Sequence, residues 1–200
     1  MGRRASRGLR IIGGQWRGRR LPVPAAPGLR PTPERVRETL FNWLQGWLAG
    51  ARCLDLFAGS GALGLEAASR GAGEVVLVER CVPVARRLRE VALELGADQV
   101  RVVTDDALRF LQRGDPGRFD LVFLDPPFGS GLLERAFSRL PAVLNDPARV
   151  YVESPAGAPL PPMPTGWRVS RHTRAGDVAG CLIEVRNGPT DGADLGAGFR

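Results

Sequence analysis

Short apolar runs alternate with longer amphipathic segments through residues 51–153 of this chain. The runs are rich in Val, Leu and Phe, as buried strands are, and the segments between them carry apolar residues at helical spacing. Such an alternation predicts a parallel sheet with helices on both faces. We expect strands at 52–57, 74–78, 100–103, 119–124 and 149–153, and helices at about 61–70, 82–95, 106–113 and 131–140.

The pattern changes after the fifth strand. Residues 155–164 hold five prolines, which predicts a loop. Two further strands, at 167–173 and 181–186, flank a Gly176-Asp177 turn and predict an antiparallel hairpin. The expected fold class is therefore α/β, with a seven-stranded and mostly parallel sheet. Residues 187–200 are rich in Gly and Asp and are expected to form a disordered tail.

A small hairpin and one helix are predicted before this sheet. The alternation on either side of Gly13-Gly14 favours a β-hairpin that places several arginines on one face, with Trp16 among them. Thr32 before Pro33 has the pattern of a helix cap followed by a first-turn proline. Apolar residues then recur at helical spacing to about residue 48, and two arginines are expected to lie off this stripe, Arg35 and Arg37.

The positive charge of the chain is concentrated in the same region. Residues 1–50 hold ten arginines and two acids, a net charge of +8, whereas residues 51–200 have a net charge of −1. A polyanion such as nucleic acid is the natural partner of such a segment, although a solvated basic leader without a partner is the alternative. The expected domains are a basic extension (1–50), a main domain (51–186) and the tail (187–200).

Composition argues against several classes of protein. No apolar stretch approaches the roughly 20 residues of a membrane span, and the basic N-terminus leads into no signal-peptide core, so we expect a cytoplasmic protein. The three cysteines, Cys53, Cys81 and Cys181, lack the paired spacing of a zinc site and are expected to be reduced packing residues, with no metal bound. The one histidine, His172, falls in a late strand and is expected to be structural.

The sequence Asp125-Pro126-Pro127-Phe128 ends the apolar run at 119–124. A strand that ends in these residues delivers them to the carboxyl edge of the sheet, where open α/β sheets bind ligands. Neither proline has an N–H, so the backbone offers carbonyl oxygens and Asp125 adds a carboxylate. A cluster of acceptors beside an aromatic ring is suited to a planar amino group, whereas an ordinary Pro-Pro turn is the simpler alternative.

A second candidate site follows the first expected strand. Gly59 and Gly61 allow a sharp turn, and with Gly64 they give the spacing of a dinucleotide-binding loop. Asp55, however, precedes these glycines, and its carboxylate would repel phosphate and attract an ammonium or sulfonium group. A cationic ligand that carries an amino acid fits this loop better.

Acids also end the next two expected strands. Glu79 ends the second strand, where an acid can accept hydrogen bonds from ribose hydroxyls. Asp106 follows the third strand and could hold an adenine amino group, with Asp105 as its rival. Because the carboxyl ends of parallel strands share one edge of the sheet, these acids are expected to line the same site as Asp125.

The motifs together resemble a known family. Residues 55–61, Glu79 and 125–128 are similar to motifs of S-adenosylmethionine-dependent methyltransferases that modify exocyclic amino groups. More narrowly, residues 10–19, 29–32 and 35–44 resemble the bacterial RsmD family, which methylates a guanine amino group in small-subunit ribosomal RNA. The likeness covers about residues 9–186; it departs at Arg80-Cys81, which replaces a further acid, and in the C-terminal hairpin and tail.

The resemblance implies a Rossmann-like methyltransferase fold, S-adenosylmethionine as cofactor, and ribosomal RNA as partner, free or in an assembled 30S particle, for a monomeric enzyme. The cofactor-binding residues that it implies are Asp55, Phe57, Ala58, Gly59, Gly61, Glu79, Arg80, Asp106 and Ala107. The catalytic residues that it implies are Asp125, Pro126, Pro127 and Phe128. The RNA-binding residues that it implies are Arg10, Gln15, Arg17, Arg19, Arg30, Thr32, Arg35 and Arg37.

Three other functions remain as alternatives. A DNA amino-methyltransferase would use similar loops but typically needs a larger target-recognition region than these fifty basic residues. A glutamine-modifying protein methyltransferase would be expected to carry Asn in place of Asp125. A non-catalytic RNA-binding assembly factor would have no physical need for acids at positions 55, 79 and 125.

Overall fold

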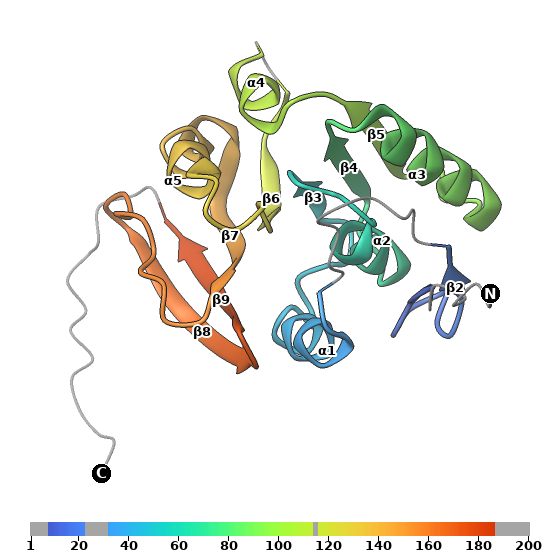
Figure 1. Ribbon diagram of the computed structural model, residues 1–200, viewed down its shortest axis with the longest axis horizontal. Coiled ribbons are helices and arrows are strands. Elements are labelled where there is room, and N and C mark those ends of the chain that lie inside the picture. The colour runs from blue at the N-terminus through green and yellow to red at the C-terminus, as the bar shows by residue number, and fades with distance from the viewer. Residues whose placement is uncertain (1–7, 23–31, 114–115, 187–200) are drawn as a thin grey trace, which may run out of the picture.

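The computed structural model describes residues 8–22, 32–113 and 116–186, and Figure 1 shows how its elements are arranged. The main sheet has seven strands in the order β5-β4-β3-β6-β7-β9-β8. Five neighbouring strands are parallel, and the last two are antiparallel. The strands are β3 (Arg52–Asp55), β4 (Glu74–Glu79), β5 (Val100–Thr104), β6 (Phe119–Leu124), β7 (Leu144–Pro155), β8 (Trp167–Ala175) and β9 (Val178–Val185). The predicted α/β fold with its C-terminal hairpin is confirmed.

Helices cover both faces of this sheet (Figure 1). α1, α2 and α3 contribute to one buried apolar cluster, and α4, α5 and η1 contribute to a second cluster on the other face. The helices are α1 (Glu34–Trp43), α2 (Ala62–Ser69), α3 (Val82–Leu95), α4 (Ala107–Gln112), α5 (Leu132–Phe137) and the 3-10 helix η1 (Leu140–Val143). The helix expected at 131–140 is thus divided, and β7 begins five residues earlier than expected.

α1 is shorter than its apolar spacing predicts. The helix ends at Trp43 and turns follow, with Gly46 at a φ of +84°. Leu44 and Leu48 are nevertheless buried, because the turns keep them against the same cluster. The apolar spacing therefore continues past Trp43, where the helix ends.

The N-terminal hairpin is present, with strands of only two residues. β1 (Leu9–Arg10) pairs with β2 (Arg20–Leu21), and the segment between them packs against α2. A Cβ at Gly14, whose φ is +77°, would lie 1.8 Å from the Ser69 carbonyl oxygen, so only glycine fits there. The expectation that Trp16 lies among the arginines is wrong, because its ring is buried in the cluster around α2.

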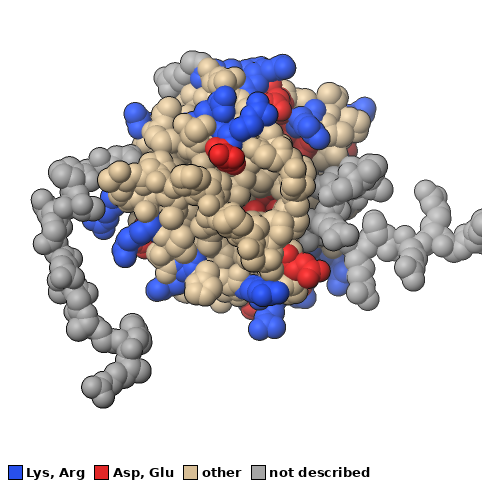
Figure 2. All heavy atoms as spheres, turned by 60° about the vertical axis from the view of Figure 1, so that its left-hand side comes forward, with Lys and Arg blue, Asp and Glu red and all other residues tan. Residues whose placement is uncertain are grey.

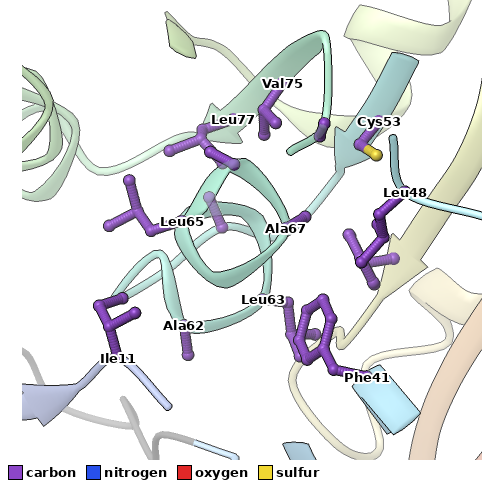
Figure 3. Close-up of a cluster of buried hydrophobic side chains, with 14 of the residues drawn as sticks. Ile11, Phe41, Leu48, Cys53, Ala62, Leu63, Leu65, Ala67, Val75 and Leu77 are labelled. Carbon is purple, nitrogen blue, oxygen red and sulfur yellow. The ribbon is translucent and has the colours of Figure 1, made fainter. Parts of the chain in front are cut away.

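α2 joins the extension to the sheet. Figure 3 shows Ile11 from the N-terminal segment and Phe41 from α1 near the helix that carries Leu63 and Leu65, with Leu77 of β4 also beside it. The buried cluster thus contains residues from both sides of the boundary expected at residue 50.

Glu66 of α2 supplies the polar part of this junction. Its side chain is fully buried and accepts the backbone N–H groups of Ile12 and Gly13, each over 2.8 Å. The same carboxylate lies 2.7 Å from Arg70 Nε and 3.5 Å from Arg37 Nη1. One carboxylate therefore ties the hairpin, α1 and α2 together.

Arg37 is a correction to the sequence analysis. Its side chain is 1% exposed, pairs with Glu66 and donates to the Arg10 carbonyl over 3.0 Å. The expectation that it lies off the apolar stripe is wrong, because the buried acid on α2 provides a partner that helical spacing does not reveal. A guanidinium held in this way is not exposed for contact with phosphate.

Glu66→Ala should destabilise the fold by about 3–5 kcal/mol, because it leaves the Arg37 charge buried without its partner. Urea unfolding followed by circular dichroism measures this loss. Glu90→Ala, which removes exposed ion pairs on α3, is the matched control and should cost less than about 1 kcal/mol. Equal small losses in both variants would contradict the role given to Glu66.

Candidate active site

Five neighbouring strands have acids at or close to their carboxyl ends, along the same edge of the sheet. In the spatial order of the strands, these acids are Asp106 after β5, Glu79 of β4, Asp55 of β3, Asp125 after β6 and Glu153 of β7. The sequence analysis placed the first four there. It missed Glu153 as a site residue, although this acid ends an expected strand in the same way as Glu79.

Asp55 lies behind the glycine loop. Its side chain is buried, and its Oδ2 accepts the Gly64 N–H over 3.0 Å. Burial raises the pKa of Asp55 to about 7, against the lowering effect of that hydrogen bond, and nearby Asp125 raises it further. Asp55 therefore holds the first turn of α2, the helix that follows the glycine loop.

The three glycines in and after the loop are required for different structural reasons. Gly61 takes a φ of +77° at the start of α2, and Gly59 takes a φ of +49°. A Cβ on Gly64, by contrast, would lie 2.2 Å from Leu77 Cδ2, so this glycine allows the helix to pack closely on the sheet. Beside them Ala58 is buried, whereas Phe57 is only half-buried.

Glu79 and the acids after β5 form the next part of the edge. Glu79 is half-buried and accepts the N–H groups of Gly59 over 2.9 Å and Cys81 over 2.7 Å. Asp106 caps α4 by accepting the N–H groups of residues 108 and 109 on Oδ1. Its rival Asp105 is buried and paired with Arg113 Nε at 2.9 Å, which gives Asp105 a structural partner. Ala107 is buried behind this cap and Arg80 is exposed.

The segment after β6 presents both a carboxylate and a ring. Asp125 is half-buried and Pro126 is buried, whereas Pro127 is exposed and its carbonyl accepts the Ser130 N–H over 3.3 Å. Phe128 is 49% exposed, although most large apolar side chains of the described residues are buried. An exposed ring beside a half-buried carboxylate is available to stack on a flat ligand.

Thr32 and Glu153 complete the surroundings of Asp125. Thr32 makes no capping bond to α1, contrary to expectation, and it is buried beside Asp125 and Glu153, where its hydroxyl acts to lower the pKa of both acids. Burial raises the pKa of Asp125 to about 6 and that of Glu153, which also lies near Asp125, to about 8. Figure 2 shows acidic atoms within a hollow that is bordered mainly by uncharged residues.

The other predicted residues fall in several environments. Arg10, Gln15, Arg17, Arg19 and Arg35 are exposed, whereas Arg30 lies outside the described residues. Cys53 and Cys181 are buried and free, but Cys81 is exposed at the start of α3, so the expectation that it packs inside is wrong. His172 is exposed on β8. No helix in the described ranges is long and apolar enough to cross a membrane.

Comparison with known proteins identifies the family. A family model described as "Conserved hypothetical protein 95" matches residues 9–184. Ribosomal RNA small subunit methyltransferase D of Escherichia coli K12 is 52% identical over 174 residues, which are 86% of this chain and 87% of the relative. The chain belongs to this methyltransferase family.

Solved structures agree with this membership. A structure of the Escherichia coli protein named methyltransferase yhhF is 46% identical, with a TM-score of 0.82 over 90% of this chain and 98% of that one. An RNA methyltransferase of Salinibacter ruber, solved with S-adenosyl-L-homocysteine, matches 84% of this chain and 100% of that one with a TM-score of 0.60. At 18% identity, this second likeness concerns the Rossmann-like methyltransferase fold alone.

The free energy of unfolding should fall as the pH rises from about 5 to about 8. Asp55, Asp125 and Glu153 have native pKa values of about 7, 6 and 8, above their unfolded values of 3.8, 3.8 and 4.5. The native state therefore holds more protons than the unfolded state in this window, and each rise in pH favours unfolding. Urea unfolding of the cofactor-free protein across this range measures the slope.

Two variants test the origin of that slope. Glu153→Gln removes one of the three titrations and should make the fall in stability shallower. Glu38→Gln changes an exposed acid of α1 and should leave the slope as it is. A parent slope that persists in Glu153→Gln would show that the buried acids do not cause it.

Proposed function

We propose that this protein transfers a methyl group from S-adenosylmethionine to the exocyclic amino group of a guanine in small-subunit ribosomal RNA. Family membership supports methyl transfer on this RNA. The observation that carries the amino target is the combination of a half-buried Asp125, the two prolines that follow it and an exposed Phe128 at the ligand-binding edge. The protein acts as a monomer on RNA that is free or part of an assembled ribosomal particle.

The methyl donor, S-adenosylmethionine, supplies when bound a reactive methyl group on a positively charged sulfur. The site fits this donor, because an edge lined by carboxylates favours a cation. In this proposal Glu79 accepts hydrogen bonds from ribose hydroxyls and Asp106 from an adenine amino group, while the glycine loop lets the backbone approach the donor closely. The residues that hold it are Asp55, Phe57, Ala58, Gly59, Gly61, Glu79, Arg80, Asp106 and Ala107.

Asp125 and the Pro126 carbonyl bind the target amino group. A guanine amino nitrogen is a weak nucleophile, because its lone pair is delocalised into the ring. When both N–H groups are held by acceptors, the lone pair is directed toward the methyl carbon. The nitrogen loses one proton as it gains the methyl group, and the Asp125 carboxylate is in position to accept that proton.

Geometry dominates the rate enhancement in this proposal. Correct placement of two reactants can supply about 7–11 kcal/mol, whereas stacking of a base on an aromatic ring contributes about 1–3 kcal/mol. Phe128 therefore tunes affinity and alignment, with Pro127 holding the turn that presents its ring. A paired base cannot reach this pocket, so the guanine is unpaired or flipped out, at a cost of a few kcal/mol.

The exposed arginines of the extension offset that cost by binding the phosphates beside the target. Arg10, Arg17 and Arg19 of the hairpin and Arg35 of α1 are exposed, and Gln15 lies exposed between them. Arg30 belongs to the same proposal from its sequence position. Buried Arg37 does not, and Thr32 contacts the catalytic acids instead of solvent.

Asp125→Ala should bind S-adenosylmethionine normally and lose turnover by at least about 100-fold, as expected when a group aimed at the reacting atoms is removed. Calorimetry measures cofactor affinity, and transfer of labelled methyl groups to small-subunit RNA measures turnover. Glu134→Ala on α5, exposed and outside the acid edge, is the control. Methylation by Asp125→Ala at close to the parent rate would refute the role of this carboxylate.

Replacing Arg10, Arg17 and Arg19 together by Gln should weaken RNA binding and leave cofactor affinity unchanged. If each arginine neutralises one phosphate, the slope of log K against log salt should fall by about two to three. A deletion of the hairpin is less informative, because it would also remove the buried Leu9, Ile11 and Trp16.

Arg101→Gln serves as the control for the triple variant. This arginine is exposed near the amino end of β5, away from the acid edge. It should leave both the affinity for RNA and the salt slope unchanged. Equal salt slopes for the parent and the triple variant would exclude the hairpin as the phosphate-binding surface.

A further inference from the structure

Glu153 is a buried acid for which the proposed transfer reaction has so far required no role. It lies on β7 beside the end of β6, because Leu124 pairs with Val152 in the parallel register and the next residues along are Asp125 and Glu153. Its exposed fraction is 3%. Burial of a carboxyl group costs free energy unless hydrogen-bond partners replace the lost water.

Two hydroxyl groups are those partners. The Tyr151 Oη donates to Glu153 Oε1 over 3.1 Å. The buried Thr32 lies beside both Glu153 and Asp125, near enough for its hydroxyl to lower the pKa of each acid. A threonine hydroxyl carries a single proton but can also accept a hydrogen bond. If both acids were ionised, Thr32 could donate to only one of them, and two like charges would remain side by side in a largely dry site.

A proton on one of the acids resolves this conflict. Other titratable or charged groups act on this pair: Asp55 of β3 and Tyr151 of β7 influence Glu153, Cys181 of β9 influences Tyr151, and the Arg37 guanidinium of α1 interacts with Glu153. Arg37 already pairs with Glu66, so it does not neutralise the two acids. Glu153 is 3% exposed, whereas Asp125 is half-buried, so ionisation is more costly for Glu153 and we assign the proton to it. Burial raises the pKa of both acids.

The proton on Glu153 sets the direction of every hydrogen bond in the group. Tyr151 donates to Glu153 Oε1. With the proton on Glu153, its carboxyl is free to donate to the Thr32 hydroxyl, and Thr32 is then free to donate to Asp125. Asp125 then remains ionised and is held on one side by Thr32, so the rest of its carboxylate is available to an amino group. If Glu153 loses its proton, it competes with Asp125 for the Thr32 proton.

We propose that Glu153 is a positioning residue, which acts as a neutral acid through Thr32 to hold the Asp125 carboxylate ionised and aimed at the target amino group. This inference rests on the proposed function, since it concerns how Asp125 is kept ready for methyl transfer. It predicts that turnover declines on the alkaline side as Glu153 loses its proton.

The neighbouring strand leaves space for this arrangement. Gly180 of β9 pairs directly with Glu153. A Cβ at Gly180 would lie 2.4 Å from Tyr151 Oη and 3.1 Å from the ring carbon Cζ. Any larger residue at position 180 would thus displace the hydroxyl that donates to Glu153.

The test is kcat as a function of pH from about 6 to about 9, with saturating S-adenosylmethionine and RNA. The parent should lose activity toward the alkaline end of this range. Glu153→Gln, whose amide can still accept from Tyr151 and donate to Thr32, should stay within about tenfold of the parent near pH 7 and lose the alkaline decline. Glu153→Ala should fall at least about tenfold below Glu153→Gln in kcat, with an unchanged KM for S-adenosylmethionine.

Tyr151→Phe gives a second reading that keeps the ring and leaves Glu153 in place. The Tyr151 hydroxyl stabilises the ionised form of Glu153, so its loss should raise the pKa of Glu153. The alkaline decline in activity should therefore move to higher pH. This variant keeps the test decisive if both replacements of Glu153 prevent folding, as judged by circular dichroism and cofactor binding.

Three outcomes would overturn the inference: an alkaline decline that persists in Glu153→Gln, parent turnover in Glu153→Ala, or an unmoved decline in Tyr151→Phe. They are distinct from failure of the proposed function. If the proposed function is wrong, Asp125→Ala remains active. If only this inference is wrong, Asp125→Ala is inactive, whereas the variants of Glu153 and Tyr151 behave like the parent.

Discussion

The arrangement of this site depends on one electrostatic constraint: three carboxylates lie close together at neighbouring strand ends, where Asp55 and Glu153 are buried and Asp125 is half-buried. Asp55, Asp125 and Glu153 lie at the carboxyl ends of β3, β6 and β7, which are adjacent in the sheet. Like charges so close together in a largely dry site cannot all be ionised without a compensating cation. The protein meets this constraint with protons and backbone hydrogen bonds, and a positively charged methyl donor would meet it more fully.

A second constraint connects this site to the basic surface. α2 begins at the glycine loop with Gly61, and Glu66 and Ser69 farther along the helix bind the N-terminal segment. The element that shapes the cofactor loop therefore also fixes the hairpin that carries exposed arginines. Thr32 makes a comparable connection, because it precedes α1 and contacts Asp125. The proposed RNA-binding and catalytic parts are thus held in one packed unit.

Local pattern predicted the sheet and most of its acid edge. Apolar runs located the strands, and the rule that ligands bind at the carboxyl ends of parallel strands brought Asp55, Glu79, Asp106 and Asp125 together. Glu153 was within reach of the same rule. No motif surrounds Glu153, however, and it comes close to Asp125 only because β7 lies beside β6 in the sheet.

The remaining errors come from contacts between distant parts of the chain. Helical spacing places Arg37 off the apolar stripe, and strand alternation places Trp16 among the arginines. Glu66 and the cluster around α2 nevertheless bury both. Thr32 has the sequence of a helix cap, but it is buried beside Asp125, which follows β6, and Glu153 of β7. Helical spacing continued past Trp43 because turns can also bury leucines. In each case, contacts with residues far away in the sequence determine whether the side chain is buried.

The most direct test of the central claim is to map the product by mass spectrometry. Small-subunit ribosomal RNA, free and in assembled particles, is incubated with the purified protein and S-adenosylmethionine that carries an isotope-labelled methyl group, then digested to nucleosides and fragments. The account predicts one labelled nucleoside, N2-methylguanosine, at a single position in the RNA. Labelled methyl groups on another base, on DNA or on protein, or no transfer to either form of the RNA, would contradict it.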